Sequence, residues 1–229
     1  DALPILFEIL EKSPKVKGLA LNTIHADYVD KNYCSKRNIK ITTLLDYTTE
    51  AVAEHAVLLV LGCFKRLFVN YRRTYRRKYL PELGQEIKGK SLGIIGLSPT
   101  GERVAELGQG LGMAVGAYNK PIIRKEHITR KTLNEVIFQS DAISLHLDLN
   151  EETKGILSKE MIARLKKGAI VINTSSRLLV NEKAIAEALT AGFVSAYAFE
   201  AESIKKSPLE GIETALMFKP FSGYTKESL

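Results

Sequence analysis

The sequence predicts a doubly wound α/β domain built on a parallel sheet, and three observations lead to this fold class. Strand-like and helix-like segments alternate regularly from residue 92 onward. The strand-like segments are continuous apolar runs, which are typical of strands buried on both faces of a parallel sheet. The first of them ends in a glycine turn that opens a helix, as in dinucleotide-binding βαβ units. We therefore expect a Rossmann-type sheet with right-handed crossovers.

The first 47 residues form a separate, short α/β segment. Its expected elements are a helix, a strand, a helix and a strand, over residues 5–10, 17–21, 28–36 and 39–43. This segment is too small to be a free-standing doubly wound domain. We therefore place a domain boundary after residue 47, which gives a partial domain over 1–47 and a Rossmann domain over 48–229.

A long helix is expected from residue 50 to about residue 70, with Thr48 or Thr49 as its cap. Apolar residues occupy nearly every face of this helix, which is typical of a helix buried between domains or subunits. The basic, tyrosine-containing arm Arg72–Tyr79 follows it. We interpret the arm as a solvated helix end or a subunit contact rather than a nucleic-acid surface. The expected partner is a second copy of the chain, bound through the 50–70 helix and the arm.

The remaining elements alternate in the order that a doubly wound domain requires. The strands are expected at 92–95, 114–117, 142–145, 170–173, 194–198 and 215–218. The helices are expected at 101–111, 133–139, 159–165 and 182–191.

The composition favours a cytoplasmic globular protein. Hydrophobic residues make up 45% of the chain, and the net charge of +7 suits an anionic ligand although it is widely spread. No apolar run reaches the ~18 residues that span a bilayer, and no leader peptide is recognisable. Cys34 and Cys63 are too few and too far apart to indicate a disulfide framework or a metal site. We expect no metal and no membrane partner.

The glycine turn is the most informative motif. Gly96, Ser98 and Gly101 stand where the dinucleotide fingerprint G-x-G-x-x-G has its three glycines. A helix N-terminus at this turn would face the pyrophosphate, with Thr100 in its first turn. Ser98 replaces the middle glycine, although its hydroxyl could donate to phosphate, and Pro99 has no N–H. The alternative is that the turn only joins a strand to a helix and binds nothing.

The position that selects between NAD and NADP carries no acidic residue. About 20 residues after the turn, an acidic side chain usually accepts from the ribose hydroxyls. Asn119 occupies this position here, followed by Lys120, with Arg124 and Lys125 nearby. A neutral residue beside cations suits a 2′-phosphate, so NADP is at least as consistent with the sequence as NAD.

Four ordered motifs together resemble the D-isomer-specific 2-hydroxyacid dehydrogenases. They are TEAVAEH at 49–55, GKSLGIIGLSPTG at 89–101, LHLDLNEETKG at 145–155 and GAIVINTS at 168–175. The resemblance implies hydride transfer between a nicotinamide cofactor and a small 2-hydroxy or 2-oxo acid. It also implies that residues 1–47 are the later part of a truncated flavodoxin-like substrate domain. The further cofactor-binding residues that it implies are His146, Leu147, Thr153, Asn173, Thr174 and Ser175.

The resemblance also implies a catalytic arginine, histidine and glutamate, and the chain departs from this pattern. Ser176 stands at the arginine position, with Arg177 one residue later, and Phe221 stands at the histidine position. The glutamate falls among three positions, of which Glu202 is our candidate; the others are Glu200 and Ile204. The nicotinamide-holding aspartate falls near Phe199, and His25 lies in the loop that would receive the substrate carboxylate.

Two hypotheses follow. In the first, the protein is an oxidoreductase with an altered route. Arg177 holds the substrate carboxylate, and the proton is supplied by water, by His25 or by a tyrosine. In the second, it is a catalytically inactive dinucleotide-binding or structural module. Among the other histidines, His55 is expected to be a hydrogen-bonded core residue, and a structural role is favoured for His146.

Overall fold

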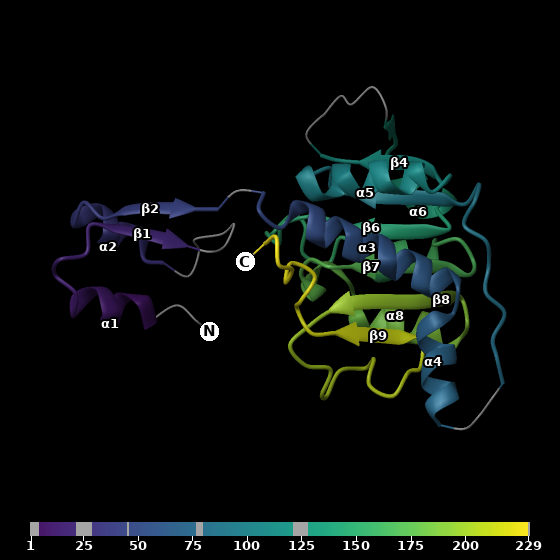
Figure 1. Cartoon of the computed structure of the whole chain (residues 1–229). Coiled ribbons are helices and arrows are strands. Elements are labelled where there is room, and N and C mark those ends of the chain that lie inside the picture. Colours follow the sequence, from purple (N-terminus) through teal and green to yellow (C-terminus); the bar gives the residue numbers. More distant parts are fainter. Residues whose placement is uncertain (1–4, 22–28, 45, 77–79, 121–127, 229) are drawn as a thin grey trace. The chain divides into compact units, whose positions relative to one another are not determined.

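The computed structural model describes residues 5–21, 29–44, 46–76, 80–120 and 128–228. These residues belong to two compact units, Asp1–Tyr47 and Thr48–Leu229 (Figure 1). We describe each unit by itself.

The smaller unit contains a two-stranded parallel sheet and two short helices. Strands β1 (Gly18–Leu21) and β2 (Lys40–Thr43) pair in register from Gly18 opposite Lys40. Helices α1 and α2 span Ile5–Glu11 and Lys31–Lys36. The buried apolar residues are few: Leu10, Val29, Cys34 and Ile39.

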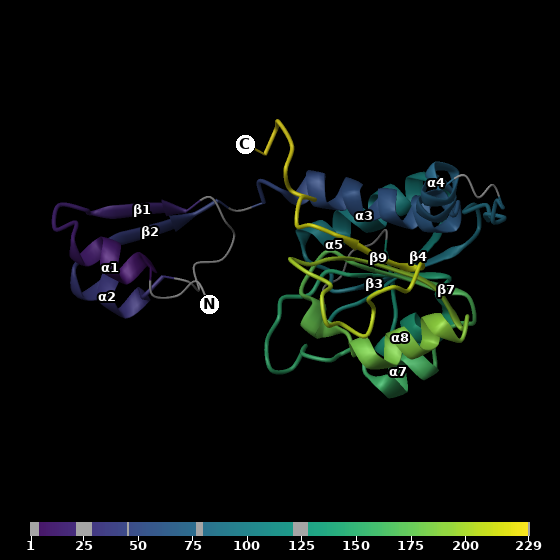
Figure 2. The same cartoon turned by 90° about the horizontal axis from the view of Figure 1, so that it is seen from below.

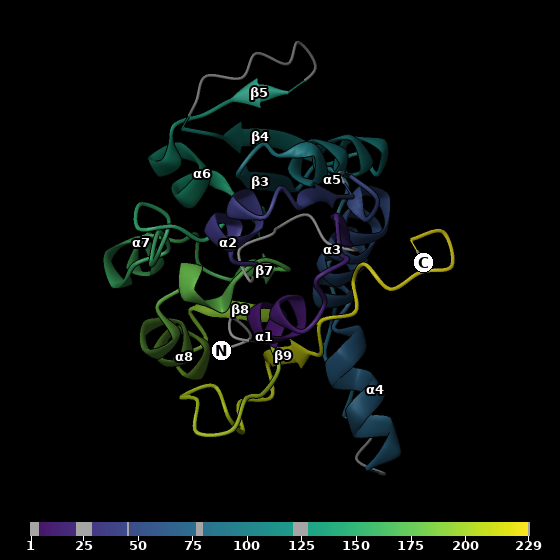
Figure 3. The same cartoon turned by 90° about the vertical axis from the view of Figure 1, so that its left-hand side faces the viewer.

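The larger unit contains a seven-stranded sheet in the order β5-β4-β3-β6-β7-β8-β9, and all neighbouring strands are parallel. Figure 3 shows β5 at one edge of this sheet and β9 at the other. The strands span Ser91–Ile95 (β3), Ala114–Tyr118 (β4), Thr129–Arg130 (β5), Ala142–Leu145 (β6), Ala169–Asn173 (β7), Val194–Glu200 (β8) and Ala215–Phe218 (β9). Strands β4 and β5 are added on one side of β3, and β6 to β9 are added on its other side, so the predicted doubly wound, Rossmann-type fold is confirmed.

Helices cover both faces of this sheet (Figure 2). One face carries α3 (Thr49–Phe64), α4 (Leu67–Tyr75) and α5 (Pro99–Gly110). The other carries α6 (Leu133–Gln139), α7 (Lys159–Ala163) and α8 (Glu182–Thr190). None of the helices in the described part of the chain is long and apolar enough to cross a membrane.

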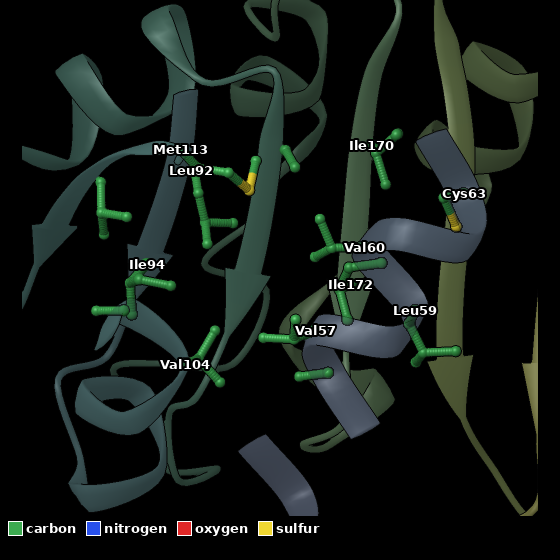
Figure 4. Packing of buried hydrophobic residues seen from close by; sticks show 14 of the residues in the cluster. Val57, Leu59, Val60, Cys63, Leu92, Ile94, Val104, Met113, Ile170 and Ile172 are labelled. Carbon is green, nitrogen blue, oxygen red and sulfur yellow. The ribbon is translucent and has the colours of Figure 1, made fainter. Parts of the chain in front are cut away.

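The two faces of the sheet explain the continuous apolar runs. Successive strand residues alternate between the two sides, so Ile94 packs in the cluster that contains α3 and α5 whereas Ile95 packs in the cluster that contains α8. Val57 and Val60 of α3 lie close to Ile172 of β7 in this core (Figure 4). Because helices cover both faces of the sheet, side chains on either side of a strand are buried, which favours apolar residues at successive strand positions.

The prediction of one long helix over 50–70 is wrong. Helix α3 ends at Phe64, Arg66 adopts a left-handed conformation with φ 53°, and α4 begins at Leu67. The Arg66 guanidinium donates to the carbonyl oxygen of Ser195 at 2.8 Å, which holds the break against β8. Within the single chain α3 is not buried on every side, because Leu58 is 51% exposed, and its burial against a second subunit stays a prediction. Thr48 is its cap residue, but the Thr48 side chain makes no capping hydrogen bond.

Three smaller differences concern the region around the candidate site. Strand β8 continues to Glu200, two residues beyond the expected end at Ala198. The edge strand β5 was not expected, and neither was a 3₁₀ turn at Arg177–Leu179. Both elements are too short to produce a periodic pattern in the sequence.

Candidate functional site

The glycine turn lies at the carboxyl end of β3, where it presses α5 against the sheet. Gly96 has φ 99°, and a Cβ atom there would lie 2.5 Å from the carbonyl oxygen of His146. A Cβ atom at Gly101 would lie 2.1 Å from the carbonyl oxygen of Gly96. Neither position has room for a side chain, so both glycines are required for this close helix–strand packing.

The first turn of α5 keeps donors for an anion. Ser98 is the cap residue, and its Oγ accepts from the Gly101 N–H at 3.2 Å. The hydroxyl proton of Ser98 is not used in this bond. Within the described residues, the backbone N–H groups of Ser98 and Thr100 have no acceptor. Pro99 removes one donor, but the remaining groups and the positive end of the helix still suit a phosphate.

Asn119 and Lys120 follow β4, the neighbouring strand. The Asn119 Oδ1 accepts from the Leu97 N–H at 2.9 Å, so this side chain fixes the glycine turn. The Lys120 Nζ lies 2.6 Å from the Glu152 Oε2, and both side chains are exposed. Arg124 and Lys125 lie outside the described residues.

The residues after β6 build the opposite side of the turn. His146 is buried, and its Nε2 lies 2.8 Å from the Ser144 Oγ. Burial lowers the pKa of His146 to about 4, so the ring is neutral at pH 7. These contacts support the structural interpretation of His146. Leu147 lies beside Gly96, and the Thr153 Oγ donates to the Asp148 carbonyl oxygen at 2.6 Å, closing the loop locally.

The turn after β7 is organised by Asn173, which is fully buried. Its Nδ2 donates to the Ser176 carbonyl oxygen at 3.0 Å and to the Tyr197 Oη at 3.2 Å. Its Oδ1 accepts from the Ser175 N–H at 3.0 Å. The Thr174 Oγ is buried without a partner in the described part of the chain. A buried hydroxyl without a partner is costly, so a ligand that bonds to Thr174 would fit this edge of the sheet.

Two of the three predicted catalytic residues, Arg177 and Glu202, lie in the described part of the chain, and both are held by other protein groups. The Arg177 guanidinium donates from Nε to the Glu182 Oε1 and from Nη1 to the Ser203 carbonyl oxygen, both at 2.6 Å. Glu202 is exposed, and its Oε2 lies 3.1 Å from the Lys219 Nζ. His25 lies outside the described residues. The catalytic roles of Arg177, Glu202 and His25 therefore stay predictions.

Glu200, one of the three positions considered for the catalytic glutamate, is a buried carboxylate next to Phe221. The Glu200 Oε1 accepts from the N–H groups of Phe221 and Ser222 at 2.9 and 2.8 Å, and Oε2 accepts from the Ser222 Oγ at 2.9 Å. The Phe221 ring packs edge-on against His55, with the ring centroids 4.9 Å apart. The position of Glu200 at the end of an apolar run was the available signal.

His55 corrects one expectation. It is half-buried, and its Nε2 has no hydrogen-bond partner among the described residues, so the prediction of a hydrogen-bonded core histidine is wrong. Burial lowers the pKa of His55, and the negative charge of Glu200 opposes this shift. Tyr197, in contrast, is fully buried, and its ring stacks on that of Phe199 with the ring centroids 4.6 Å apart.

The strand order and the glycine turn define the class of protein: a dinucleotide-binding α/β domain. Residues 57–220 match the family model described as D-isomer specific 2-hydroxyacid dehydrogenase, NAD binding domain. The chain belongs to this family, which confirms the resemblance seen in the sequence and the expectation of an NAD(P)-binding domain.

Known relatives agree with this assignment. A hydroxypyruvate reductase from Blautia hydrogenotrophica is 29% identical over 98% of this chain and 74% of that protein. A D-lactate dehydrogenase from Aquifex aeolicus, solved with NAD and lactic acid, has a TM-score of 0.81 at 28% identity, covering 96% of this chain and 74% of that one. An acyclic imino acid reductase (Bsp5), solved with NADPH and D-Arg, has a TM-score of 0.84 at 28% identity. The match covers 96% of this chain and 73% of that chain.

Proposed function

We propose that the protein is an NAD(P)H-dependent oxidoreductase that interconverts a small 2-oxo acid and the corresponding 2-hydroxy acid. The observation that carries the proposal is the glycine turn, which packs α5 as a dinucleotide-binding helix within a chain of this family. When bound, the nicotinamide would supply or accept the hydride. Hydroxypyruvate is the substrate named for the relative from Blautia hydrogenotrophica, and lactic acid is bound in the Aquifex aeolicus structure.

The residues present fit a dinucleotide at two places. The N–H groups of Ser98 and Thr100, with the Ser98 hydroxyl, would hold the pyrophosphate at the N-terminus of α5. The buried Thr174 Oγ would bond to a group of the cofactor at the end of β7. Asn173 keeps the backbone of this turn in place through its three hydrogen bonds.

The first experiment measures thermal unfolding with NADH and with NADPH, followed by turnover of hydroxypyruvate, glyoxylate and pyruvate. A dinucleotide at ~100 times its Kd should stabilise the protein by roughly 2.7 kcal/mol. Thr174→Val should weaken this binding about 3- to 10-fold, because it removes one hydrogen bond. Thr190→Val is the matched control, since the Thr190 Oγ donates to the carbonyl oxygen of Ala186 in its own helix. Absence of stabilisation by either dinucleotide would overturn the proposal.

A second candidate function is that of a catalytically inactive dinucleotide-binding module, and the residue at position 221 favours it. Phe221 stands where the resemblance places a proton-transferring histidine, and Arg177 is held by Glu182. Loss of a positioned acid–base group typically costs ~10²–10⁴-fold in rate. Dinucleotide binding without turnover of any 2-oxo acid would therefore identify a catalytically inactive binding module.

The proposed partner is a second copy of the chain, bound through α3, α4 and the segment after α4. Large apolar side chains are exposed there: Leu67, Tyr71, Tyr75, Leu80 and Leu83. The neighbouring cation Arg73 is already paired with Glu82 at 2.7 Å and Glu213 at 2.9 Å, which argues against a nucleic-acid surface. Sedimentation should show a dimer at micromolar concentration and a monomer for Leu83→Lys. A monomeric unaltered protein would overturn this assignment.

We also propose that the protein works in the cytoplasm. Cys34 and Cys63 are free thiols, and both are buried. Free cysteines are typical of proteins in a reducing compartment. Localisation of a tagged full-length protein by fractionation would test this.

A further inference from the structure

A pocket of about 440 Å³ lies at the carboxyl ends of β4 and β5, one strand away from the glycine turn. The polar residues that line it are Asn119, Lys120, Arg130, Lys131, Thr132 and Glu135. Asn119 connects the pocket to the turn, because its Oδ1 accepts from the Leu97 N–H at 2.9 Å. A dinucleotide whose pyrophosphate lies at the turn would place its adenosine ribose near this pocket.

Most charged groups of the pocket already have partners. The Lys120 Nζ is 2.6 Å from the Glu152 Oε2, and the Lys131 Nζ donates to the Gln139 Oε1 at 2.9 Å. The Glu135 carboxylate accepts from both the N–H and the hydroxyl of Thr132 at 2.7 Å, as part of the cap of α6.

Arg130 is the exception. Its side chain is exposed, and it has neither a carboxylate partner nor a hydrogen-bond acceptor in the part of the chain that the structure describes. It lies at the end of the short edge strand β5, beside Lys131. The pocket therefore contains one guanidinium that remains available to an anion.

The pocket also lacks the acceptor that a free ribose would need. In NAD-binding domains an acidic side chain after this strand accepts from the 2′-hydroxyl. Here Asn119 occupies the position, and its oxygen already bonds to Leu97. A 2′-phosphate carries a charge of about −1.5 to −2 at pH 7, which a guanidinium binds through two parallel hydrogen bonds.

We propose that this pocket binds the 2′-phosphate of NADPH, with Arg130 as the residue that selects NADPH over NADH. This inference rests on the proposed function, since it requires a dinucleotide at the glycine turn. Lys120 and Lys131 add positive charge to the pocket. Its one lining carboxylate, Glu135, is bonded to Thr132, and Asn119 places no carboxylate at the ribose position.

Calorimetric titration of the full chain with NADPH and with NADH tests the inference without relying on turnover. NADPH should bind at least about tenfold more tightly than NADH, as expected for a charge-assisted contact. Arg130→Gln should weaken NADPH binding about tenfold and leave NADH binding unchanged. Lys183→Gln is the control: it removes one exposed cation from α8, which lies on the face of the sheet opposite α5, and should alter neither affinity.

A second variant tests the same pocket from the opposite direction. Asn119→Asp keeps an oxygen for the Leu97 N–H but adds a carboxylate, so it should weaken NADPH binding and strengthen NADH binding. Equal affinities for the two dinucleotides, or an equal loss of both in Arg130→Gln, would overturn the inference and leave the proposed function standing. Failure of both dinucleotides to bind would overturn the two together, so the failures are distinguishable.

Discussion

The two units of the chain use the same kinds of element but differ in how deeply they bury them. In the smaller unit, β1 and β2 alternate between exposed and half-buried positions, and the core contains Leu10, Val29, Cys34 and Ile39. In the larger unit, β6 and β7 are buried at every position, because helices cover both faces of the sheet. Since burial of an apolar side chain contributes about 1.5–3 kcal/mol, we expect nearly all of the stability to lie in the larger unit.

Core truncation should show the largest difference between the units. Ile143 is fully buried in β6, and Ile143→Ala should lower the free energy of unfolding of the main transition by about 2–5 kcal/mol. Leu10→Ala, in the smaller unit, should leave that transition where it is. Urea unfolding followed by circular dichroism measures both variants. A main transition that shifts equally in the two variants would show that the units unfold together.

The second largest effect is expected from acidification, which should destabilise the larger unit. Burial lowers the pKa of His146 to about 4, from an ordinary value near 6.5. Between these pH values the unfolded chain binds a proton that the folded chain does not. The contribution of His146 to the free energy of unfolding, about 3 kcal/mol, is therefore fully present above pH 6.5 and is lost as the pH falls towards 4.

His146→Gln should remove this part of the pH dependence while keeping a polar partner for the Ser144 Oγ. The described residues of the smaller unit include no histidine, so none of them should contribute a matching effect. Thermal midpoints between pH 4 and pH 7 measure the effect. An unchanged slope in His146→Gln would assign the acid sensitivity to other groups.

A smaller difference between the units is expected in the rates at which their two cysteines are alkylated. Burial raises the pKa of both thiols, and that of Cys63 to about 12. Reaction with an alkylating reagent therefore requires local opening. We expect Cys34 to react about tenfold faster than Cys63, because the core around it is small. Mass spectrometry of timed samples measures the rates, with protein in urea as the control. Faster labelling of Cys63 would contradict the comparison.

Removal of the smaller unit should have the least effect on the larger one. A chain that begins at Asp46 keeps all of α3 and the seven-stranded sheet. Its thermal midpoint should lie within about 4 °C of that of the full chain, which corresponds to roughly 1 kcal/mol for a domain of this size. Calorimetry measures it, and a much lower midpoint would show that residues 1–45 stabilise the sheet.

The strands of the larger unit were predictable because burial on both faces leaves a strong pattern. The strands Ala142–Leu145 and Ala215–Phe218 and the helix Leu133–Gln139 have the predicted bounds. The break between α3 and α4 was not predictable. It depends on a left-handed Arg66 whose guanidinium bonds to Ser195, a residue distant in the sequence.

The candidate site was predictable only in part, for a related reason. The turn at Gly96 and Gly101 carries a local signature, since close packing excludes every side chain there. The contacts of Glu200 with the backbone of Phe221 and Ser222, and those of Arg177 with Glu182 and Ser203, depend on side-chain orientation at strand ends. A sequence motif locates such residues but does not give the direction in which they point.

The strand order has a further consequence, for the rate at which the chain acquires its structure. Every neighbouring pair in the large sheet is parallel, so each pairing must join segments separated by a whole crossover, such as Leu92 with Ala142. Contacts between distant segments slow folding and favour transient, partly collapsed species. We therefore expect refolding through at least one kinetic intermediate, whose unpaired strands would be the species most prone to aggregate during synthesis.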